Sequence, residues 1–253
     1  MGTVFRALDT VLAQPVALKV LSGGQDAMVD RFLREARLLA EIEHPAVVRY
    51  VAQGAEGASL WLAMEWLEGL DLAERLAKGP LGVRSVLQMA HRAAEGLAKA
   101  HAAGVVHRDV KPSNLYLVEG DPARTKLIDF GVARTGGRTK HLTTTGQFVG
   151  TAGYMAPEQI VGEREVDARA DVFSLGCVLF EALTGRPAFP GDSIIAVLAK
   201  VLKDDPPRAS ELEPRTPRAL DDLIASMLAK KPGDRPDDAA RVVELLRLVE
   251  ESG

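Results

Sequence analysis

Apolar positions recur along this 253-residue chain with two different periods, and the change of period divides it into two unequal regions. Residues 3–21 and 46–66 contain short runs rich in β-branched and aromatic residues, which predicts strands. A stretch with helical spacing, at about 27–43, separates them. From about residue 71 onward helical spacing dominates. The pattern therefore predicts a small β-rich region followed by a larger helical one.

Two helices of the second region stand out. Residues 83–104 are amphipathic over several turns, and Gly104 provides a C-terminal stop. Residues 171–185 are apolar on almost every side, which predicts a helix buried inside the region and ending at Gly185. The proline-rich stretch at 204–217 has the composition of an interdomain linker, but helical spacing resumes directly after it. We interpret it as a loop within one helical unit.

Composition narrows the class of protein without indicating an activity. Hydrophobic residues make up 47% and charged residues 26%, which is ordinary for a globular protein. The formal net charge of −4 gives no basic footprint, so we expect no nucleic-acid binding. Cys177 is the only cysteine, which excludes an internal disulfide and favours a reducing compartment, so we expect a cytoplasmic location. Because no apolar run reaches membrane-spanning length, we expect no membrane segment in this chain.

The strand predicted at 15–21 places a small residue and a lysine on one face. Alternate residues of a strand share a face, so Ala17, Lys19 and Leu21 lie together. That face suits a flat purine covered by Ala17, with the ammonium group of Lys19 reaching phosphates beyond it. A half-exposed strand with a solvated lysine is the alternative, and it is the commoner case for an isolated lysine.

The helix predicted at 27–43 adds a carboxylate to this picture. Glu35 falls inside an apolar stripe when successive residues are placed about 100° apart. The stripe consists of Phe32, Ala36, Leu39 and Ile42. A carboxylate on a buried face is costly unless it is paired, and Lys19 is the obvious partner. We therefore predict an ion pair between Lys19 and Glu35, the alternative being a glutamate that is merely tolerated.

The strongest chemical signal is the stretch HRDVKPSN at 107–114, followed by DFG at 129–131. Together the two motifs supply a lysine and three oxygen donors of the type that Mg²⁺ prefers. These residues are Lys111, Asp109, Asn114 and Asp129. The alternative is a polar loop beside an unrelated turn, but so many residue types fixed at once make coincidence a poor explanation.

The two motifs resemble the catalytic and metal-binding loops of eukaryotic-type protein kinases, and the whole chain is similar to the bacterial eukaryotic-like serine/threonine protein kinases. The resemblance implies one protein kinase domain over 1–250 with a bilobal α+β fold. A small β-rich N-lobe, lacking its first strand, would cover about 1–66. A hinge at about 64–70 would lead to a larger helical C-lobe over about 71–250, with the active site between the lobes.

The resemblance also implies a role for each residue of the motifs. Asp109 would orient the incoming hydroxyl group and accept its proton, and Lys111 would neutralise charge on the migrating phosphoryl group. Asn114 and Asp129 would be the metal ligands that hold Mg²⁺. The family gives His107 a packing role, so we predict that it is not catalytic.

Contacts with ATP are implied for two further regions. The start of the chain, MGTVF, matches only the last three positions of the family's glycine-rich loop, which covers the nucleotide phosphates. Either residues precede this sequence in the natural protein or the protein lacks the lid, and the sequence leaves both open. The hinge would place Met64 behind the adenine, with core packing as the alternative, and would bond the adenine edge through backbone groups. The nucleotide-binding residues implied are Gly2, Val4, Ala17, Lys19, Glu35, Met64, Glu65 and Leu67.

Substrate class follows from Lys111 in DVKPSN and Thr151 in GTAGYMAPE, because both stretches resemble serine/threonine kinases. Small-molecule phosphotransferases of related fold lack the GYMAPE segment. Glu158 and Arg235 match an ion pair that anchors this segment in the family. Asp171 would hold the backbone of the catalytic loop, and a carboxylate that merely favours a helix N-terminus is the alternative.

The segment before Glu158 carries three consecutive threonines, Thr143–Thr145. We predict that their phosphorylation orders this segment, with Arg108 binding the phosphate, and the alternative is a flexible polar loop. The sequence thus predicts a serine/threonine protein kinase that uses ATP and Mg²⁺, acts on protein substrates and self-associates for autophosphorylation. One alternative is a kinase-fold scaffold module with impaired nucleotide binding, because the first strand and two glycines are absent. A small-molecule phosphotransferase is the other, which the GYMAPE segment disfavours.

Overall fold

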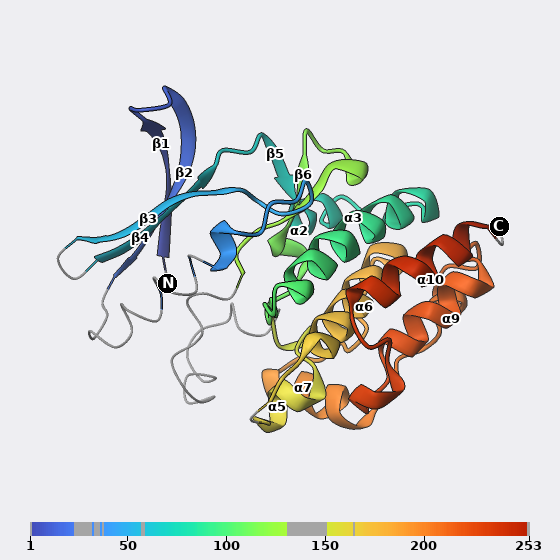
Figure 1. Ribbon diagram of the computed structural model, residues 1–253. Coiled ribbons are helices and arrows are strands. Elements are labelled where there is room, and N and C mark those ends of the chain that lie inside the picture. The colour runs from blue at the N-terminus through green and yellow to red at the C-terminus, as the bar shows by residue number, and fades with distance from the viewer. Residues whose placement is uncertain are drawn as a thin grey trace.

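A small lobe built on a β-sheet and a larger lobe built mainly of helices are joined through residues 65–69 (Figure 1). This computed structural model describes residues 2–22, 32, 36, 38–56, 59–130, 151–163 and 165–251. The order of the elements confirms the predicted α+β fold with two lobes.

In the described part of the small lobe, four antiparallel strands form a sheet in the spatial order β1-β2-β4-β3. They are β1 (Gly2–Asp9), β2 (Gln14–Ser22), β3 (Tyr50–Glu56) and β4 (Ser59–Glu65). Each predicted β-rich region is therefore confirmed as a pair of strands. One face of β4 carries Leu60, Leu62 and Met64, which are buried in a common core with Phe32 and Ala36.

Of the range 27–43 that was predicted as a helix, the structure describes residues 32, 36 and 38–43, and it shows residues 32, 36 and 38–40 as helical. Its helical conformation ends at Ala40, a few residues before the predicted end. The chain turns here towards Pro45, and a proline disfavours helical geometry at the residue before it. Glu35 lies outside the described residues, so its predicted ion pair with Lys19 stays a prediction.

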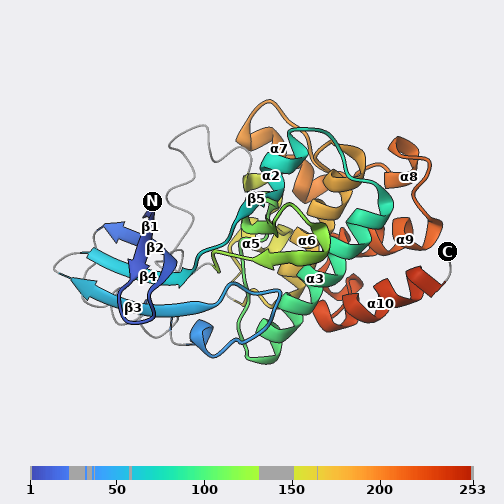
Figure 2. The same ribbon diagram turned by 90° about the horizontal axis from the view of Figure 1, so that it is seen from above.

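The large lobe is organised around α6 (Ala168–Thr184), nearly all of whose side chains are buried. Gly185 follows α6 with φ = 69°, a left-handed conformation that suits glycine, which confirms the predicted end. The long amphipathic helix is confirmed as α3 (Val83–Ala102), and it packs against α6 and α10 (Figures 1 and 2). The other helices are α2 (Leu72–Leu76), α5 (Pro157–Val161), α7 (Ile194–Lys203), α8 (Ala209–Leu212), α9 (Arg218–Met227) and α10 (Ala239–Glu251). Because α8 lies within 204–217 and packs on α6 and α9, this stretch belongs to the helical unit, as predicted.

A second, three-stranded sheet lies in the large lobe beside α2 and α3, and the helical pattern of that region did not predict it. Its strands are β5 (Gly69–Asp71), β6 (Leu115–Val118) and β7 (Thr125–Leu127). Among the described residues, the lobe also contains the 3-10 helices η1 (Pro112–Asn114), η2 (Pro122–Arg124) and η3 (Pro232–Asp234). Strand β6 follows η1 directly, so this sheet positions the end of the catalytic loop.

Residues 46–48, which we call the strap, join the small lobe to the second sheet. The N–H of Val48 donates to the carbonyl of Leu127 at 2.9 Å, and the N–H of Leu127 donates to the carbonyl of Ala46 at 2.8 Å. A Cβ atom on Gly96 of α3 would lie 2.9 Å from that Ala46 oxygen, so only glycine allows this close approach. The strap therefore holds the back of the small lobe against the large one.

None of the helices in the described part of the chain is both long enough and apolar enough to cross a membrane. Helix α6 is packed inside the large lobe, and Cys177 within it is buried.

Candidate active site

Asp109 contacts two of the side chains predicted to act with it. The Nζ atom of Lys111 lies 2.9 Å from Oδ2 of Asp109, and Nδ2 of Asn114 lies 3.1 Å from the same oxygen. The Asn114 amide also donates to the backbone carbonyl of Asp109 at 2.7 Å. Because these contacts use the amide nitrogen, they leave the Asn114 amide oxygen for a cation.

A buried carboxylate fixes the backbone of the catalytic loop, as predicted. Asp171 of α6 is completely buried, and its two oxygens accept the N–H groups of His107 and Arg108, each at 2.7 Å. His101 of α3 lies 3.0 Å from the same carboxylate through Nε2, and its Nδ1 accepts the N–H of Ala239 at 3.3 Å. The loop is thereby tied to α3, α6 and α10 at once. Asp171 also lies in the first turn of α6, where the helix dipole favours a negative charge.

His107 uses both ring nitrogens within the protein. Its Nδ1 accepts the N–H of Asp109 at 3.3 Å, and its Nε2 donates to the carbonyl of Ile128 at 3.1 Å. Its ring lies 4.4 Å from that of Phe130, and burial lowers the pKa of His107. A neutral imidazole with both nitrogens engaged has none left for a substrate proton, in agreement with the predicted packing role.

Between the two lobes, Lys19 of β2 forms an ion pair with Asp129. Its Nζ lies 2.8 Å from Oδ1 of Asp129, and both side chains are partly buried. The N–H of Ile128 donates to the carbonyl of Asn114 at 3.0 Å, which brings the backbones of the two predicted metal ligands together. Asp129 and Asn114 supply a carboxylate and an amide, which fits Mg²⁺, because that ion takes few protein ligands and completes its shell with water and phosphate oxygens. No group of three His, Cys, Asp or Glu residues in the described part of the chain is arranged to hold a metal.

Strand register places the side chains of the predicted nucleotide face on one side of the small sheet, and their binding of a nucleotide stays a prediction. Val4 pairs with Lys19 across β1 and β2, and Ala17 pairs with Met64 across β2 and β4. Directly paired residues share a face, and so do alternate ones, so all four line one side of the sheet. Met64 is buried at its inner end, whereas Val4 is exposed. This arrangement leaves a surface of small and apolar groups leading to the Lys19 ammonium.

The hinge side chain of Glu65 is turned away from that face. Its Oε1 accepts the N–H of Arg49 at 2.8 Å and forms an ion pair with Lys126. The Tyr116 hydroxyl donates to the carbonyl of Leu67 at 3.3 Å. The Glu65 side chain and the Leu67 carbonyl are therefore engaged within the protein, and recognition of an adenine edge by backbone groups of the hinge stays a prediction.

Helix α5 is anchored by a buried ion pair. Both Glu158 oxygens accept the guanidinium of Arg235, at 2.7 and 3.0 Å, and both side chains are almost wholly buried. This contact confirms the predicted pair. The predicted phosphorylation sites Thr143–Thr145 and the glycine of DFG lie outside the described residues.

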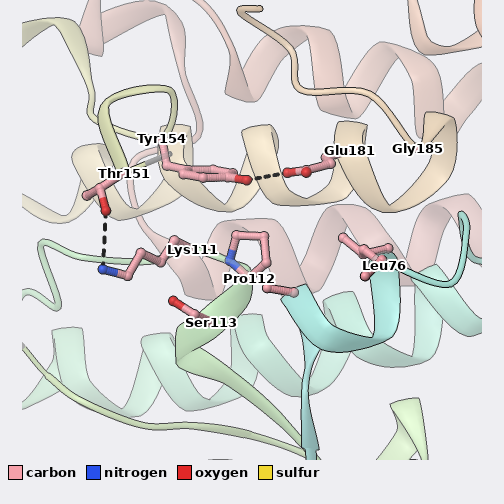
Figure 3. Close-up of a pocket in the computed structure, with 10 residues that line it drawn as sticks. Leu76, Lys111, Pro112, Ser113, Thr151, Tyr154, Glu181 and Gly185 are labelled. Carbon is pink, nitrogen blue, oxygen red and sulfur yellow. Dashed lines mark hydrogen bonds between the residues drawn. The ribbon is translucent and has the colours of Figure 1, made fainter. Parts of the chain in front are cut away.

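A cavity of about 600 Å³ opens beside Lys111, between α2, the catalytic loop and α6 (Figure 3). Thr151 accepts a hydrogen bond from Lys111 Nζ at 3.5 Å, and the Tyr154 hydroxyl donates to Glu181 on the same wall. Burial raises the pKa of the Glu181 carboxyl. Tyr154 and Glu181 were not among the predicted site residues. The sequence feature that could have indicated this contact was Glu181, an acidic residue directly after the apolar run at 172–180.

The chain matches the family model described as "Protein kinase domain" over residues 1–245. It is 40% identical over 242 residues to serine/threonine-protein kinase PknL of Mycobacterium tuberculosis, covering 94% of this chain and 60% of that protein. It is 37% identical over 260 residues to serine/threonine-protein kinase PknB of Mycolicibacterium smegmatis, covering 99% of this chain and 41% of the relative. The chain therefore spans 60% or less of the length of these two relatives.

Solved structures show the same fold. The Mycobacterium tuberculosis PknI kinase domain superposes with a TM-score of 0.75 at 28% identity, covering 100% of this chain and 91% of that chain. A crystal structure of Rad53 in complex with AMP-PNP gives a TM-score of 0.79 at 27% identity, covering 96% of this chain and 60% of that chain.

Proposed function

The chain belongs to the protein kinase domain family, and from this premise we propose that it transfers the γ-phosphoryl group of ATP to serine and threonine hydroxyl groups of proteins. The observation that carries the proposal is the contact of Asp109 with both Lys111 and Asn114, beside an ion pair that joins Lys19 to Asp129. The named serine/threonine kinases among its relatives support it. We propose residues 1–250 as one kinase domain with the predicted lobe boundaries.

Each side chain at this site has a separate task in the proposed reaction. Asp109 orients the substrate hydroxyl group and accepts its proton, and Lys111, which is held by Asp109, donates to the phosphoryl group in transfer. Asn114 and Asp129 would hold Mg²⁺, which when bound neutralises charge on the phosphates. Lys19 would turn from Asp129 towards the phosphates, since its ammonium group already lies in the cleft.

Nucleotide recognition in this proposal is mainly apolar. Ala17, Val4 and Met64 line the sheet face on which the adenine would lie, and backbone groups of Glu65 and Leu67 would bond its edge. Gly2 precedes this face at the start of β1. Glu35 stays a predicted partner of Lys19.

Protein substrates would lie in the cavity beside Lys111. Thr151 and Tyr154 form one wall of it, and Leu76 and Pro112 lie opposite (Figure 3). Because Thr151 and Tyr154 of the GTAGYMAPE segment line this cavity together with Lys111, the cavity supports a protein substrate over a small molecule. We further propose a cytoplasmic location, where ATP is available, together with self-association and phosphorylation at Thr143–Thr145.

The proposal is tested by comparing wild type with Asp109→Asn and Asp129→Ala for Mg-ATP binding and for phosphate transfer to a general protein substrate. We expect Asp109→Asn to bind Mg-ATP normally and to lose transfer by about 10²- to 10⁴-fold, because only proton acceptance is removed. We expect Asp129→Ala to lose Mg-ATP affinity as well. Transfer by wild type no faster than by Asp109→Asn, with Mg-ATP bound, would favour a scaffold module instead.

A further inference from the structure

Arg108, directly before Asp109, has a backbone conformation that is disfavoured for its residue type. Its φ angle is 62°, in the left-handed region where a Cβ atom meets the following carbonyl oxygen. Such a conformation persists only where the surrounding structure holds it. The direction of the Asp109 side chain depends on it, because the peptide group between residues 108 and 109 turns with Arg108.

Two side chains hold this conformation from opposite ends of the residue. The Arg108 N–H donates to Oδ1 of Asp171 at 2.7 Å, and Nε2 of Gln159 donates to the Arg108 carbonyl at 3.1 Å. The direction of the Arg108 N–H group depends on its φ angle, and the direction of its carbonyl group depends on its ψ angle. Holding both groups therefore fixes both dihedral angles of Arg108.

Gln159 makes a second hydrogen bond that fixes its amide. Its Oε1 accepts the N–H of Ala156 at 2.9 Å, which requires Nε2 to face Arg108. The position thus needs a donor and an acceptor on one planar group, a combination that an amide supplies and a carboxylate or an alkyl chain does not. The neighbouring residue of α5, Glu158, is buried in the ion pair with Arg235. One short helix is therefore attached to the lobe core by one residue and to the catalytic loop by the next.

We propose that Gln159 is a positioning residue, which couples the docking of α5 to the backbone of Arg108 and so to the orientation of Asp109. Without this donor, the peptide group between Arg108 and Asp109 keeps the hydrogen bond of the Asp109 N–H to His107 Nδ1, at 3.3 Å, but loses the one at its carbonyl. The Asp109 side chain is then held less firmly in the position in which it contacts Lys111 and Asn114. The kinetic part of this inference rests on the proposed kinase function, whereas the conformational part does not.

The test uses Gln159→Glu, which keeps an oxygen for the Ala156 N–H and replaces only the donor to Arg108. Gln159→Met removes both the donor to Arg108 and the acceptor of the Ala156 N–H without adding charge, and Gln88→Glu on α3 makes the same change as Gln159→Glu away from the loop. We expect both Gln159 variants to lower kcat by about ten-fold, in line with the loss of one hydrogen bond. KM for ATP would change less than about two-fold, as expected when the nucleotide contacts are untouched. Gln88→Glu would match wild type.

A second measurement does not depend on activity. Hydrogen exchange at the Arg108 and Asp109 amides would be faster in both Gln159 variants, with the thermal unfolding midpoint unchanged. Unchanged exchange, or a kcat equal to that of Gln88→Glu, would overturn the inference. So would a fall in kcat accompanied by a matching loss of unfolding midpoint, since that indicates general destabilisation. An inactive wild type would overturn the proposed function, and the exchange comparison would still decide the role of Gln159.

Discussion

Replacing Glu158 by glutamine isolates the charge of the ion pair that anchors α5. Arg235 has five N–H donors, and each finds an acceptor: two on Glu158 and one carbonyl each on Ala229, Arg169 and Lys230, at 2.7 to 3.1 Å. The guanidinium is fully buried and also lies 4.9 Å from the ring of Phe173. Glu158 therefore supplies the counter-charge in an otherwise complete set of contacts.

Glutamine at 158 keeps the shape but turns one acceptor into a donor that faces Arg235, and it leaves the buried cation without its counter-charge. Breaking a buried pair from one side costs about 3–5 kcal/mol of the free energy of unfolding. For a chain of this length, a loss of ~3 kcal/mol corresponds to a fall in the thermal midpoint of roughly 6–12 °C. Urea unfolding and differential scanning calorimetry of wild type and variant measure both quantities.

The matched control is Glu244→Gln in the exposed pair that Glu244 forms with Arg241 on α10. Solvent screens that pair, so we expect a loss below ~0.5 kcal/mol. Equal losses in Glu158→Gln and Glu244→Gln would refute the reasoning. The carbonyl contacts of Arg235, and not its ion pair, would then hold α5 in place.

Three further predictions concern the buried residues Asp171, Gly96 and His107. Asp171→Asn leaves one of two backbone N–H groups without an acceptor, so we expect a loss of about 1–3 kcal/mol in urea unfolding and a fall in kcat of about ten-fold or more. Gly96→Ala places a methyl group 2.9 Å from the Ala46 oxygen, and we expect a net loss of about 1 kcal/mol in urea unfolding despite better helix propensity. Burial lowers the pKa of His107, so on acidification the unfolded chain takes up a proton at this residue at a higher pH than the folded chain does. The free energy of unfolding is therefore greatest above about pH 6.5 and falls below it, by at most ~1.4 kcal/mol per pH unit. We expect His107→Phe to remove that part of the pH dependence, which unfolding free energies of wild type and variant at pH 5.5 and 7.5 would measure. An equal change between the two pH values in wild type and variant would contradict this reasoning.

Local sequence pattern was sufficient to predict an arrangement that depends on the period of apolar residues or on the fixed spacing of a motif. Alternation along β2 placed Ala17 and Lys19 on one face, and strand register confirms it. The almost wholly apolar run that became α6 indicated burial on every side, as found. HRDVKPSN placed Asp109, Lys111 and Asn114 within eight residues, so the loop had little freedom to separate them.

Contacts between elements that lie far apart in the sequence could not be predicted from local pattern. Strand β5 has three residues and pairs with β6, almost fifty residues later, so no local period marks it. Gln159 and Arg108 are separated by 51 positions, and neither residue type signals the other. The pairing of Tyr154 with Glu181 likewise depends on how α6 packs beneath the segment before α5. Such contacts arise from the tertiary fold, which the period of apolar residues along the sequence does not determine.

The strap restricts how the two lobes can move relative to each other. A body attached to another at two separate points keeps one easy motion, rotation about the line that joins them. Here the points are the chain connection at 65–69 and the hydrogen bonds of the strap to Leu127. Asp129 lies two residues beyond Leu127 and stays near that axis, whereas Lys19 lies on a strand of the rotating lobe. Rotation of the lobes apart about this line would therefore carry Lys19 away from Asp129 and break their 2.8 Å contact.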